Sequence, residues 1–517
     1  MKDFQPSGDG PNRRQFLQWA SSVGLAAIAP DTVAEVASAK EKREKPDSTP
    51  ESERGDPTSE VNLPHLLDQP KVQQNITRHD ETSNPEVFYN RFLKEGLQNN
   101  PDKDTFKVVV GTVGERKTIT TEGTYQRTIH GWKPTAGEIS ELSQFGSVGY
   151  TSSFNGTTVT IKGVERGDIP KIAERDFVLR LTWDAPIALD ADNCGDGSGI
   201  NVDTLRSNDY YWFRNIDGEY DISSDIRIGI IDTGYDATET AYASPHASDI
   251  GIDGSLAKDF TTDGDPNNDT YSQDECYSHG TNVADTTAYM LDSSACHSNL
   301  FVPLKIWSDS NRNDEQAASD NLRDAIEYAV QNDIEVINIS SGMRNTTMLT
   351  NYCTEQFCNS LNSYAMADYI ATATSGNAGH TDSVQQPGGS WLTIGTGGIN
   401  QNRCSNADYQ RDGSSCYAPS YDYTTCNYCE NYASSGSSPT VYGSYHTETD
   451  AGKVISGTSF AAPAAATCAA VMQANGIFNF SYARGHYEDM NMHTICPDEA
   501  AKDGELLDGY EAHYSTN

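Results

Sequence analysis

From residue 221 onward, short apolar runs alternate with amphipathic segments, and this alternation constrains the fold more than any other feature. Leu322, Ile326 and Val330 recur at helical spacing between two of the runs. Strands that are apolar on both faces and alternate with such helices predict an α/β fold with a doubly wound, mostly parallel sheet, whose sites form at the carboxyl ends of the strands. The strand-like runs are "DIRIGIID" (225–232), "LFVPLKIW" (300–307), "IEVINIS" (334–340), "DYIATAT" (368–374) and "WLTIG" (391–395).

Residues 104–190 carry a different pattern, which predicts a small domain of its own. A strand, "TFKVVVGTV", is followed by a helix, "TAGEISELSQFG", and by a hairpin that turns at Asn155-Gly156. A short helix with Pro170 in its first turn and a final strand, "FVLRLTWD", complete the segment. The order β-α-β-β-α-β predicts an α+β split-βαβ domain. It contains no cluster of histidines, cysteines or paired acids, so we expect no catalysis there.

The N-terminal third indicates export. Arg13 and Arg14 precede a short apolar run, and "ASA" at 37–39 is a small-residue cleavage site, so residues 1–39 resemble a twin-arginine signal. A short amphipathic anchor helix is the alternative. We interpret 40–103 as an acidic linker with an unassigned segment, and 191–220 as the junction to a domain at 221–517. Beyond the signal no segment reaches about 18 apolar residues, so we predict no membrane span in the mature form.

The chain is strongly acidic. Its 517 residues include 36 Lys and Arg against 74 Asp and Glu, a formal net charge of −38, while 36% of residues are hydrophobic. Such a charge argues against a nucleic-acid partner. The apolar content predicts a folded protein with a strongly hydrated surface, and high salt, which screens repulsion within a few ångströms, suits that surface. We therefore expect a saline habitat.

Eleven cysteines in an exported chain favour disulfides, and the odd number leaves at least one unpaired. A zinc site is the alternative for the group Cys404, Cys416, Cys426 and Cys429, but its spacing fits no strong ligand pattern. Cys468 lies within an apolar segment and is interpreted as a small core residue.

The stretch "KVISGTSFAAPAAATCAAVMQANG" (453–476) predicts a helix of small apolar residues that begins on a hydroxyl. Ser459 at its start has two interpretations. Serine caps helices by accepting a hydrogen bond from a first-turn amide. A helix N-terminus also stabilises an oxyanion, so Ser459 can instead be a nucleophile. The second interpretation requires a base, an orienting carboxylate and a second oxyanion donor elsewhere in the chain.

Three other segments supply these groups. Asp232 closes the strand "DIRIGIID", His279 stands at the start of a helical segment in "SHGTNVADTTAYM", and Asn377 follows a strand in "ATSGNAG". Taken singly, each has a structural interpretation: a helix-capping aspartate, a histidine without a chemical role, and an asparagine in a turn. Together they complete the set that a nucleophilic serine needs.

The motifs "DTG", "HGT", "SGN" and "GTSFAAP", in this order, resemble those of the subtilisin-like serine proteases. The resemblance implies a serine endopeptidase in which Ser459 attacks, His279 is the general base, Asp232 orients the histidine, and Asn377 with the Ser459 N–H binds the oxyanion. It also implies that 104–190 is an inhibitory propeptide. Combined with the signal and the acidity, it predicts a secreted, halophilic archaeal member, made as a precursor and active as a monomer.

Substrate binding follows from the same resemblance. Residues 338–342, "NISSG", resemble the family's exposed strand, so Ser340, Ser341 and Gly342 are expected to pair with extended polypeptide substrates. The chain departs from the family's usual wording at Asn282, where a second histidine is expected, and at Asp285, where a glycine is expected. These positions concern helix packing, so the catalytic assignment is unchanged.

The chemistry requires no cofactor, but family members often bind structural calcium. Asp263, Asp265 and Asp269 in "DGDPNNDT" (263–270) have spacings that suit oxygen ligands, while an acidic surface loop is the alternative interpretation. Two other functions remain open from sequence. One is a catalytically inactive relative that binds peptides in the same crevice. The other is an acidic surface or adhesion protein, which internal repeats would indicate. The sequence contains no such repeats.

Overall fold

In the computed structural model, every described residue lies within the compact unit formed by Glu51–Thr516. Nothing is described for residues 1–59, so the predicted signal and most of the predicted linker fall outside the described part, whereas residues 60–62 at the end of the linker form a strand. The described residues are 60–63, 65, 93, 97–98, 100–122, 126–184, 187–189, 226–236, 251–269, 279–290, 300–308, 315–343, 360–361, 364, 367–374, 376, 387–388, 392–399, 441–444, 446–448, 454–456, 458–474 and 505–506. Among their helices, none is both long enough and apolar enough to cross a bilayer.

The segment 104–190 forms the predicted four-stranded antiparallel sheet, in the order β5-β6-β2-β7. Helix α5 (Ala136–Leu142) begins with a capping box, in which Thr135 and Glu138 each accept a hydrogen bond from the other's backbone N–H. Helix α6 (Ile169–Ala173) has proline in its first turn, as predicted. The split-βαβ order is therefore observed. The strands are β2 (Thr105–Thr112), β5 (Ser147–Thr151), β6 (Thr158–Glu165) and β7 (Val178–Trp183).

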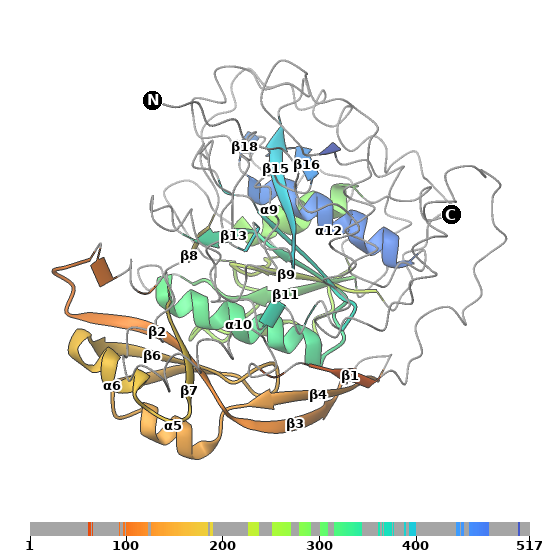
Figure 1. The fold of residues 1–517 in the computed structure, drawn as a ribbon. Helices are drawn as coiled ribbons and strands as arrows, with labels where there is room; N and C mark the ends of the chain where they lie inside the picture. Colours follow the sequence, from red (N-terminus) through yellow and green to blue (C-terminus); the bar gives the residue numbers. More distant parts are fainter. Residues whose placement is uncertain are drawn as a thin grey trace, which may run out of the picture. The chain divides into compact units, whose positions relative to one another are not determined.

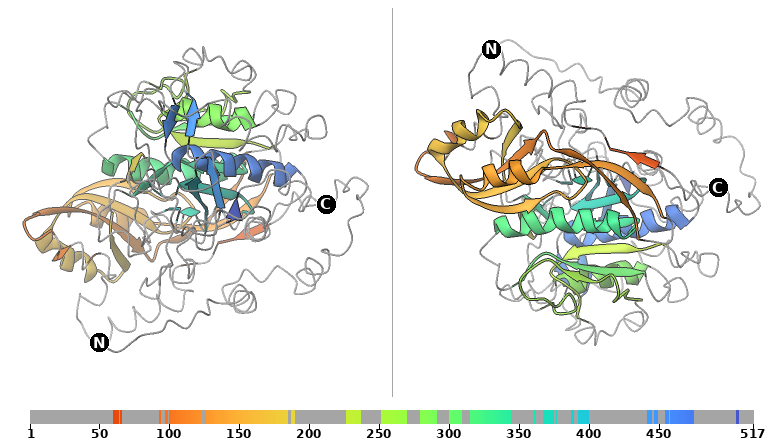
Figure 2. Two further views of the ribbon diagram at one scale, coloured as in Figure 1. Left: turned by 90° about the horizontal axis from the view of Figure 1, so that it is seen from above. Right: turned by 90° about the horizontal axis from the view of Figure 1, so that it is seen from below.

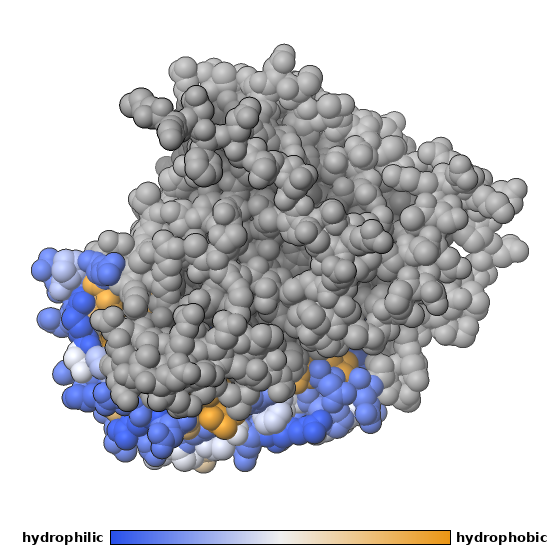
Figure 3. Space-filling view, in the orientation of Figure 1, coloured by the Kyte–Doolittle hydropathy of each residue, from blue (hydrophilic) through white to orange (hydrophobic). Residues whose placement is uncertain are grey.

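A second, three-stranded sheet joins this domain and was not predicted. The hairpin of β3 (Glu115–Thr120) and β4 (Thr128–Lys133) pairs with β1 (Glu60–Asn62) in the order β1-β4-β3. Gly131 lets strand β4 lie close to the loop between β5 and β6, because a Cβ on Gly131 would lie 1.9 Å from the Phe154 carbonyl oxygen. In Figure 3 the described surface of this part of the molecule is mostly hydrophilic, with a few hydrophobic residues between.

The larger sheet is parallel throughout, in the order β10-β11-β9-β12-β14-β15-β16-β19. All five predicted strands are present in it, and β10, β16 and β19 are additions. The strands that follow β9 in the chain lie on both sides of it, with β10 and β11 on one side and β12 and β14 on the other, as a doubly wound sheet requires. The strands are β9 (Ile228–Asp232), β10 (Lys258–Asp259), β11 (Phe301–Lys305), β12 (Val336–Ile339), β14 (Ile370–Thr374), β15 (Ile394–Ile399), β16 (Val441–Ser444) and β19 (Glu505–Leu506).

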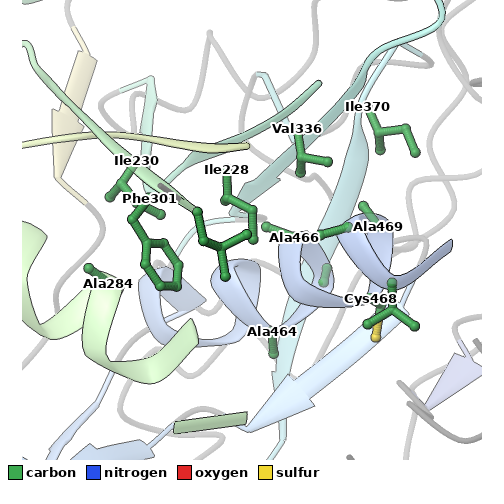
Figure 4. Packing of buried hydrophobic residues seen from close by; sticks show 14 of the residues in the cluster. Ile228, Ile230, Ala284, Phe301, Val336, Ile370, Ala464, Ala466, Cys468 and Ala469 are labelled. Carbon is green, nitrogen blue, oxygen red and sulfur yellow. The ribbon is translucent and has the colours of Figure 1, made fainter. Parts of the chain in front are cut away.

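Three long helices cover the parallel sheet. Helices α9 (His279–Met290) and α12 (Thr458–Ala474) lie on one face, and α10 (Glu315–Gln331) lies on the other (Figure 1, Figure 2). Helix α12 crosses β12, β14, β15 and β16, and its alanines let it approach the strands closely. In Figure 4, Ala466 and Ala469 face strand residues such as Val336, whereas Ala464 points away from these strands, and all of them belong to one buried cluster. Cys468 is fully buried there, as predicted.

Candidate active site

Asp232 and His279 meet at the carboxyl end of β9. Asp232 is the last residue of this strand and His279 is the first of α9, and the histidine Nδ1 lies 2.7 Å from Asp232 Oδ1. Both side chains are almost completely buried. The Thr233 N–H donates to the same carboxylate oxygen over 2.7 Å, which fixes the carboxylate in place. A carboxylate bonded to Nδ1 sets the tautomer of the imidazole and leaves Nε2 for proton exchange.

Two glycines allow this contact. Gly234 has a φ of +114°, a conformation that side chains disfavour. A Cβ on Gly280 would lie 2.3 Å from the Gly234 carbonyl oxygen and 3.1 Å from Asp232 Cβ. The Gly280 N–H also donates to Thr233 Oγ1 over 2.8 Å. The glycines of "DTG" and "HGT" are thus required for the β9 turn to lie against the start of α9.

Ser459 lies at the N-terminal end of α12, where the sequence places it. Its Oγ donates to the Ser340 carbonyl oxygen over 3.2 Å, and Ser340 Oγ donates to the Ser459 carbonyl oxygen over 2.8 Å. Phe460, the next residue, has its ring centroid 5.5 Å from that of His279, and α12 packs against α9. The serine therefore lies beside the end of β12, and the residue that follows it, Phe460, lies against His279.

The predicted peptide-binding residues lie in an edge strand that is already paired. Ser341 and Gly342 belong to β13 (Ser341–Met343), which runs antiparallel to β8 (Ile187–Leu189). In this register Ser341 lies opposite Leu189 and Gly342 opposite Ala188. Sequence reasoning missed β8, although the short apolar run after "TWDAP" is a weak signal for it. Main-chain pairing is how an edge strand holds an extended peptide.

Asn377 lies outside the described residues. Before it, the structure describes Ile370–Thr374 and Gly376, whose φ is +99° and whose N–H donates to Thr374 Oγ1 over 3.3 Å. The side chain of Asp285 is also outside the described part, whereas Asn282 is buried in α9. The oxyanion role of Asn377 stays a prediction.

The three aspartates proposed for calcium have separate partners. Asp263 lies 3.7 Å from Lys305 Nζ, and the Asp265 carboxylate accepts the Asn267 N–H over 2.9 Å. Asp269 is buried and accepts both the N–H and the hydroxyl of Thr281, each over 2.8 Å. Among the described residues, no three His, Cys, Asp or Glu side chains are grouped as a metal ion requires. Asp269 instead satisfies a free N–H in the first turn of α9.

Burial controls the titration of this aspartate. Removal from water raises the pKa of Asp269 to about 6, hydrogen bonds from Thr233 and Thr281 oppose the shift, and the nearby charge of Asp232 adds to it. A second buried carboxyl group therefore lies beside the Asp232–His279 pair.

Comparison with known proteins places this geometry in a family. The subtilase family model (Peptidase S8) matches residues 223–506, more than half of the chain. Among curated protein sequences, nothing matches.

Three solved structures to which the chain is similar are distant from it in sequence. Fervidolysin from Fervidobacterium pennivorans, a keratinolytic enzyme related to subtilisin, is 16% identical with a TM-score of 0.48, over 79% of this chain and 61% of its own. The epidermin leader peptide processing protease of Staphylococcus aureus is 14% identical with a TM-score of 0.48, over 80% and 99%. A protease of Pseudoalteromonas arctica is 17% identical with a TM-score of 0.37, over 62% and 94%. By the family model, this chain belongs to the subtilase family of serine-type endopeptidases.

Proposed function

We propose that the chain is an exported endopeptidase that hydrolyses peptide bonds through Asp232, His279 and Ser459. As Ser459 Oγ bonds to the substrate carbonyl carbon, its proton passes to His279 Nε2. The histidine then gives this proton to the leaving amine as the C–N bond breaks, and water hydrolyses the acyl-enzyme. Asp232 balances the charge of the imidazolium. The observation that carries the proposal is the buried 2.7 Å bond between His279 Nδ1 and Asp232 Oδ1, close to the start of α12.

The oxyanion of the tetrahedral intermediate would be bound by the Ser459 N–H and the side-chain amide of Asn377. The free N–H groups and partial positive charge at the start of α12 favour negative charge there. In a subtilisin, removal of the asparagine donor lowers kcat by roughly 10²- to 10³-fold. We expect Asn377→Ala to have an effect of this size on kcat and little effect on substrate binding.

Segment 104–190 would inhibit the peptidase in the precursor. Its strand β8 pairs with β13, the edge expected to bind substrate, so an extended substrate and β8 would compete for the same main-chain groups. The rest of the segment docks on α10. The Glu327 carboxylate accepts hydrogen bonds from the Ser153 N–H (2.8 Å), the Phe154 N–H (3.1 Å) and the Tyr150 hydroxyl (2.8 Å). These contacts support an inhibitor that is held at two places.

A fluorophosphonate probe tests the catalytic proposal directly, because it reacts only with an activated serine. We expect the mature enzyme to be labelled and to hydrolyse casein, and Ser459→Ala and His279→Ala to abolish both. The alternative is a catalytically inactive, peptide-binding relative. Mature protein that resists the probe, or that is labelled equally after Ser459→Ala, would establish that alternative.

The inhibitory proposal has its own test. A fragment of residues 104–190 added to the mature enzyme should inhibit hydrolysis, and the same fragment without residues 187–190 should inhibit less because it lacks β8. Absence of inhibition at high fragment concentration would assign the segment another role and would leave the catalytic proposal standing.

The remaining proposals rest on sequence. Residues 1–39 would direct twin-arginine export and secretion, the mature enzyme would be a monomer that acts on extended polypeptides, and structural calcium would bind without a part in the chemistry. With a net charge of −38, the protein should gain thermal stability as salt is raised to molar concentrations.

A further inference from the structure

A buried charge cluster lies where the antiparallel sheet meets α10. It consists of Lys107 on β2, Asp184 just after β7, and Asp320 and Arg323 on α10. Lys107 Nζ lies 2.5 Å from Asp184 Oδ2 and 2.9 Å from Asp320 Oδ1. Arg323 lies 2.5 Å from Asp184 and 3.1 Å from Asp320. On the sheet side, Lys162 Nζ on β6 also lies 3.4 Å from Asp320 Oδ2, but its side chain is one-third exposed. Among the buried groups, each side of the contact contributes one cation and one anion, and each carboxylate binds both buried cations.

The cluster is closed to water and tightly enclosed. The side chains of Lys107 and Asp184 have no exposed area, Arg323 is 1% exposed and Asp320 is 8% exposed. Thr160 donates its hydroxyl to Asp320 over 2.7 Å. A Cβ on Gly149 would lie 2.3 Å from Asp320 Oδ2, so the sheet reaches the helix at van der Waals distance. Figures 1 and 2 show α10 lying along this sheet.

The pKa values of Asp184 and Arg323 are both shifted toward the charged form. Burial alone would raise the pKa of Asp184, but the charges of Arg323 and Lys107 outweigh it and hold this pKa below the usual value. For Arg323, burial acts to lower the pKa, and the two carboxylates outweigh it and raise the pKa. The contact is thus a network of buried ion pairs, in which each charge depends on partners from the other side.

Net charge does not determine which domain can bind to α10 of the peptidase part. Residues 191–517 contain 13 basic and 46 acidic residues, a net charge of −33, whereas residues 104–190 contain 10 and 11, a net charge of −1. The acidic character of the chain is therefore concentrated in the peptidase part. Any nearly neutral domain would meet the same long-range field, so discrimination between domains has to come from short-range contacts.

We infer that the cluster of Lys107, Asp184, Asp320 and Arg323 is the specificity determinant by which the peptidase accepts its own inhibitory domain. The inference rests on the proposed role of residues 104–190. A domain with neutral residues in place of Lys107 and Asp184 would still bury Asp320 and Arg323. Asp320 would then lose Lys107 as a partner, and Arg323 would lose Asp184. Such unpaired burial rejects wrong partners more strongly than the cluster adds affinity for the right one.

Compensating substitutions across the contact test this inference. The full-length chain with Ser459→Ala receives a recognition sequence for a site-specific protease within residues 191–220, and the dissociation constant of the two pieces is measured after cleavage. Lys107→Met leaves the two carboxylates with one buried cation, and Asp320→Asn leaves the two buried cations with one carboxylate. Each should weaken association about 100-fold or more. The two changes together leave the 2.5 Å pair of Asp184 and Arg323 intact.

We therefore expect Lys107→Met with Asp320→Asn to bind within about tenfold of the unsubstituted chain. The mismatched pair, Lys107→Met with Arg323→Met, should bind more weakly than either single variant because it leaves two carboxylates without a buried cation, and only the partly exposed Lys162 remains beside Asp320. Lys171→Met is the matched control, since it breaks an exposed ion pair with Asp168 in the same domain. It should change nothing.

Single variants that bind as well as the unsubstituted chain, or matched and mismatched pairs that bind equally, would overturn the inference. Thermal melting of the uncut chains verifies folding. Where a Lys107 variant does not fold, the isosteric Asp184→Asn and its partner change Arg323→Met give the same comparison, because the 2.9 Å pair of Lys107 and Asp320 remains. Association is measured without catalysis, so its outcome is independent of the fluorophosphonate test.

Discussion

Substitution of Gly280 by alanine should separate the geometry of the site from the stability of the fold. The new Cβ would begin 2.3 Å from the Gly234 carbonyl oxygen and 3.1 Å from Asp232 Cβ. Ordinary contact distances require the start of α9 to move by about 1 Å. His279 is the neighbouring residue and moves with it, away from an Asp232 oxygen that is now 2.7 Å from its ring nitrogen.

The expected magnitude follows from this displacement. Misplacement of a catalytic group by about 1 Å costs roughly 10²-fold in rate, and overpacking of a buried site costs about 1–3 kcal/mol of stability. We expect Gly280→Ala to lower kcat by about 10²-fold and to leave KM nearly unchanged. Peptide hydrolysis by the mature enzyme at substrate concentrations above and below KM measures both constants, and thermal melting measures the stability.

A matched control is available in the same part of the molecule. An added Cβ on Gly254 would have no atom within 4 Å. Gly254→Ala should therefore keep both activity and melting temperature. A folded Gly280→Ala enzyme with kcat within threefold of the unsubstituted enzyme would refute the reasoning, because it would show that the close approach of β9 and α9 does not position the histidine.

Two further predictions concern acid and metal ions. The lowered pKa of Asp184 means that its carboxylate contributes fully to docking above its ordinary value of 3.8, and that this contribution is lost as pH falls through the lowered pKa. Asp184→Asn should thus weaken association of the two pieces of the cleaved Ser459→Ala chain at pH 7, but not at a pH below the lowered pKa. A difference in dissociation constant that persists at such a low pH would contradict this. If the mature enzyme binds calcium, a chelator should lower its melting temperature, and Asp265→Asn should leave that effect unchanged because the three aspartates have separate partners. A chelator effect abolished by Asp265→Asn would place the ion in this loop.

The parts of the fold that sequence predicts are those with local signals. Strand β9 is a nearly continuous apolar run, and α12 is a long run of small apolar residues, so both follow from the periodicity of burial alone. The order of elements in 104–190 follows from the periodicity of its segments, from Asn155-Gly156 and from Pro170. Asp232, His279 and Ser459 could be proposed as a catalytic set because each stands at the end of a predicted element.

What sequence missed depends on distant contacts. Strand β3 is exposed along nearly its whole length, so it has no alternation of burial to detect. Strand β8 has three residues, and its partner Met343 is more than 150 positions away from Ile187. Asp269 accepts hydrogen bonds from Thr281, a partner that the chain brings near only on folding. The polar face of α10 looks like a solvated surface until the sheet that covers it is known.

The register of β8 on β13 also predicts the bond that the precursor cleaves first. Ser341 lies opposite Leu189 and Gly342 opposite Ala188, and Ser340 exchanges hydrogen bonds with Ser459. If the antiparallel pairing continues by one residue, position 190 comes opposite Ser340, and its carbonyl becomes the one nearest to Ser459 Oγ.

Self-cleavage would then form an acyl-enzyme at Asp190 and release Ala191 as the new N-terminus. Mass spectrometry of the purified mature enzyme measures this end, and Asp190→Pro should slow its appearance because proline cannot donate a main-chain hydrogen bond. Lys171→Met, an exposed change in the same domain and outside the strand pairing, is the control. A mature N-terminus several residues from Ala191 would mean that β8 does not lie on β13 as a substrate does, and β8 would then block the cleft without being cut in it.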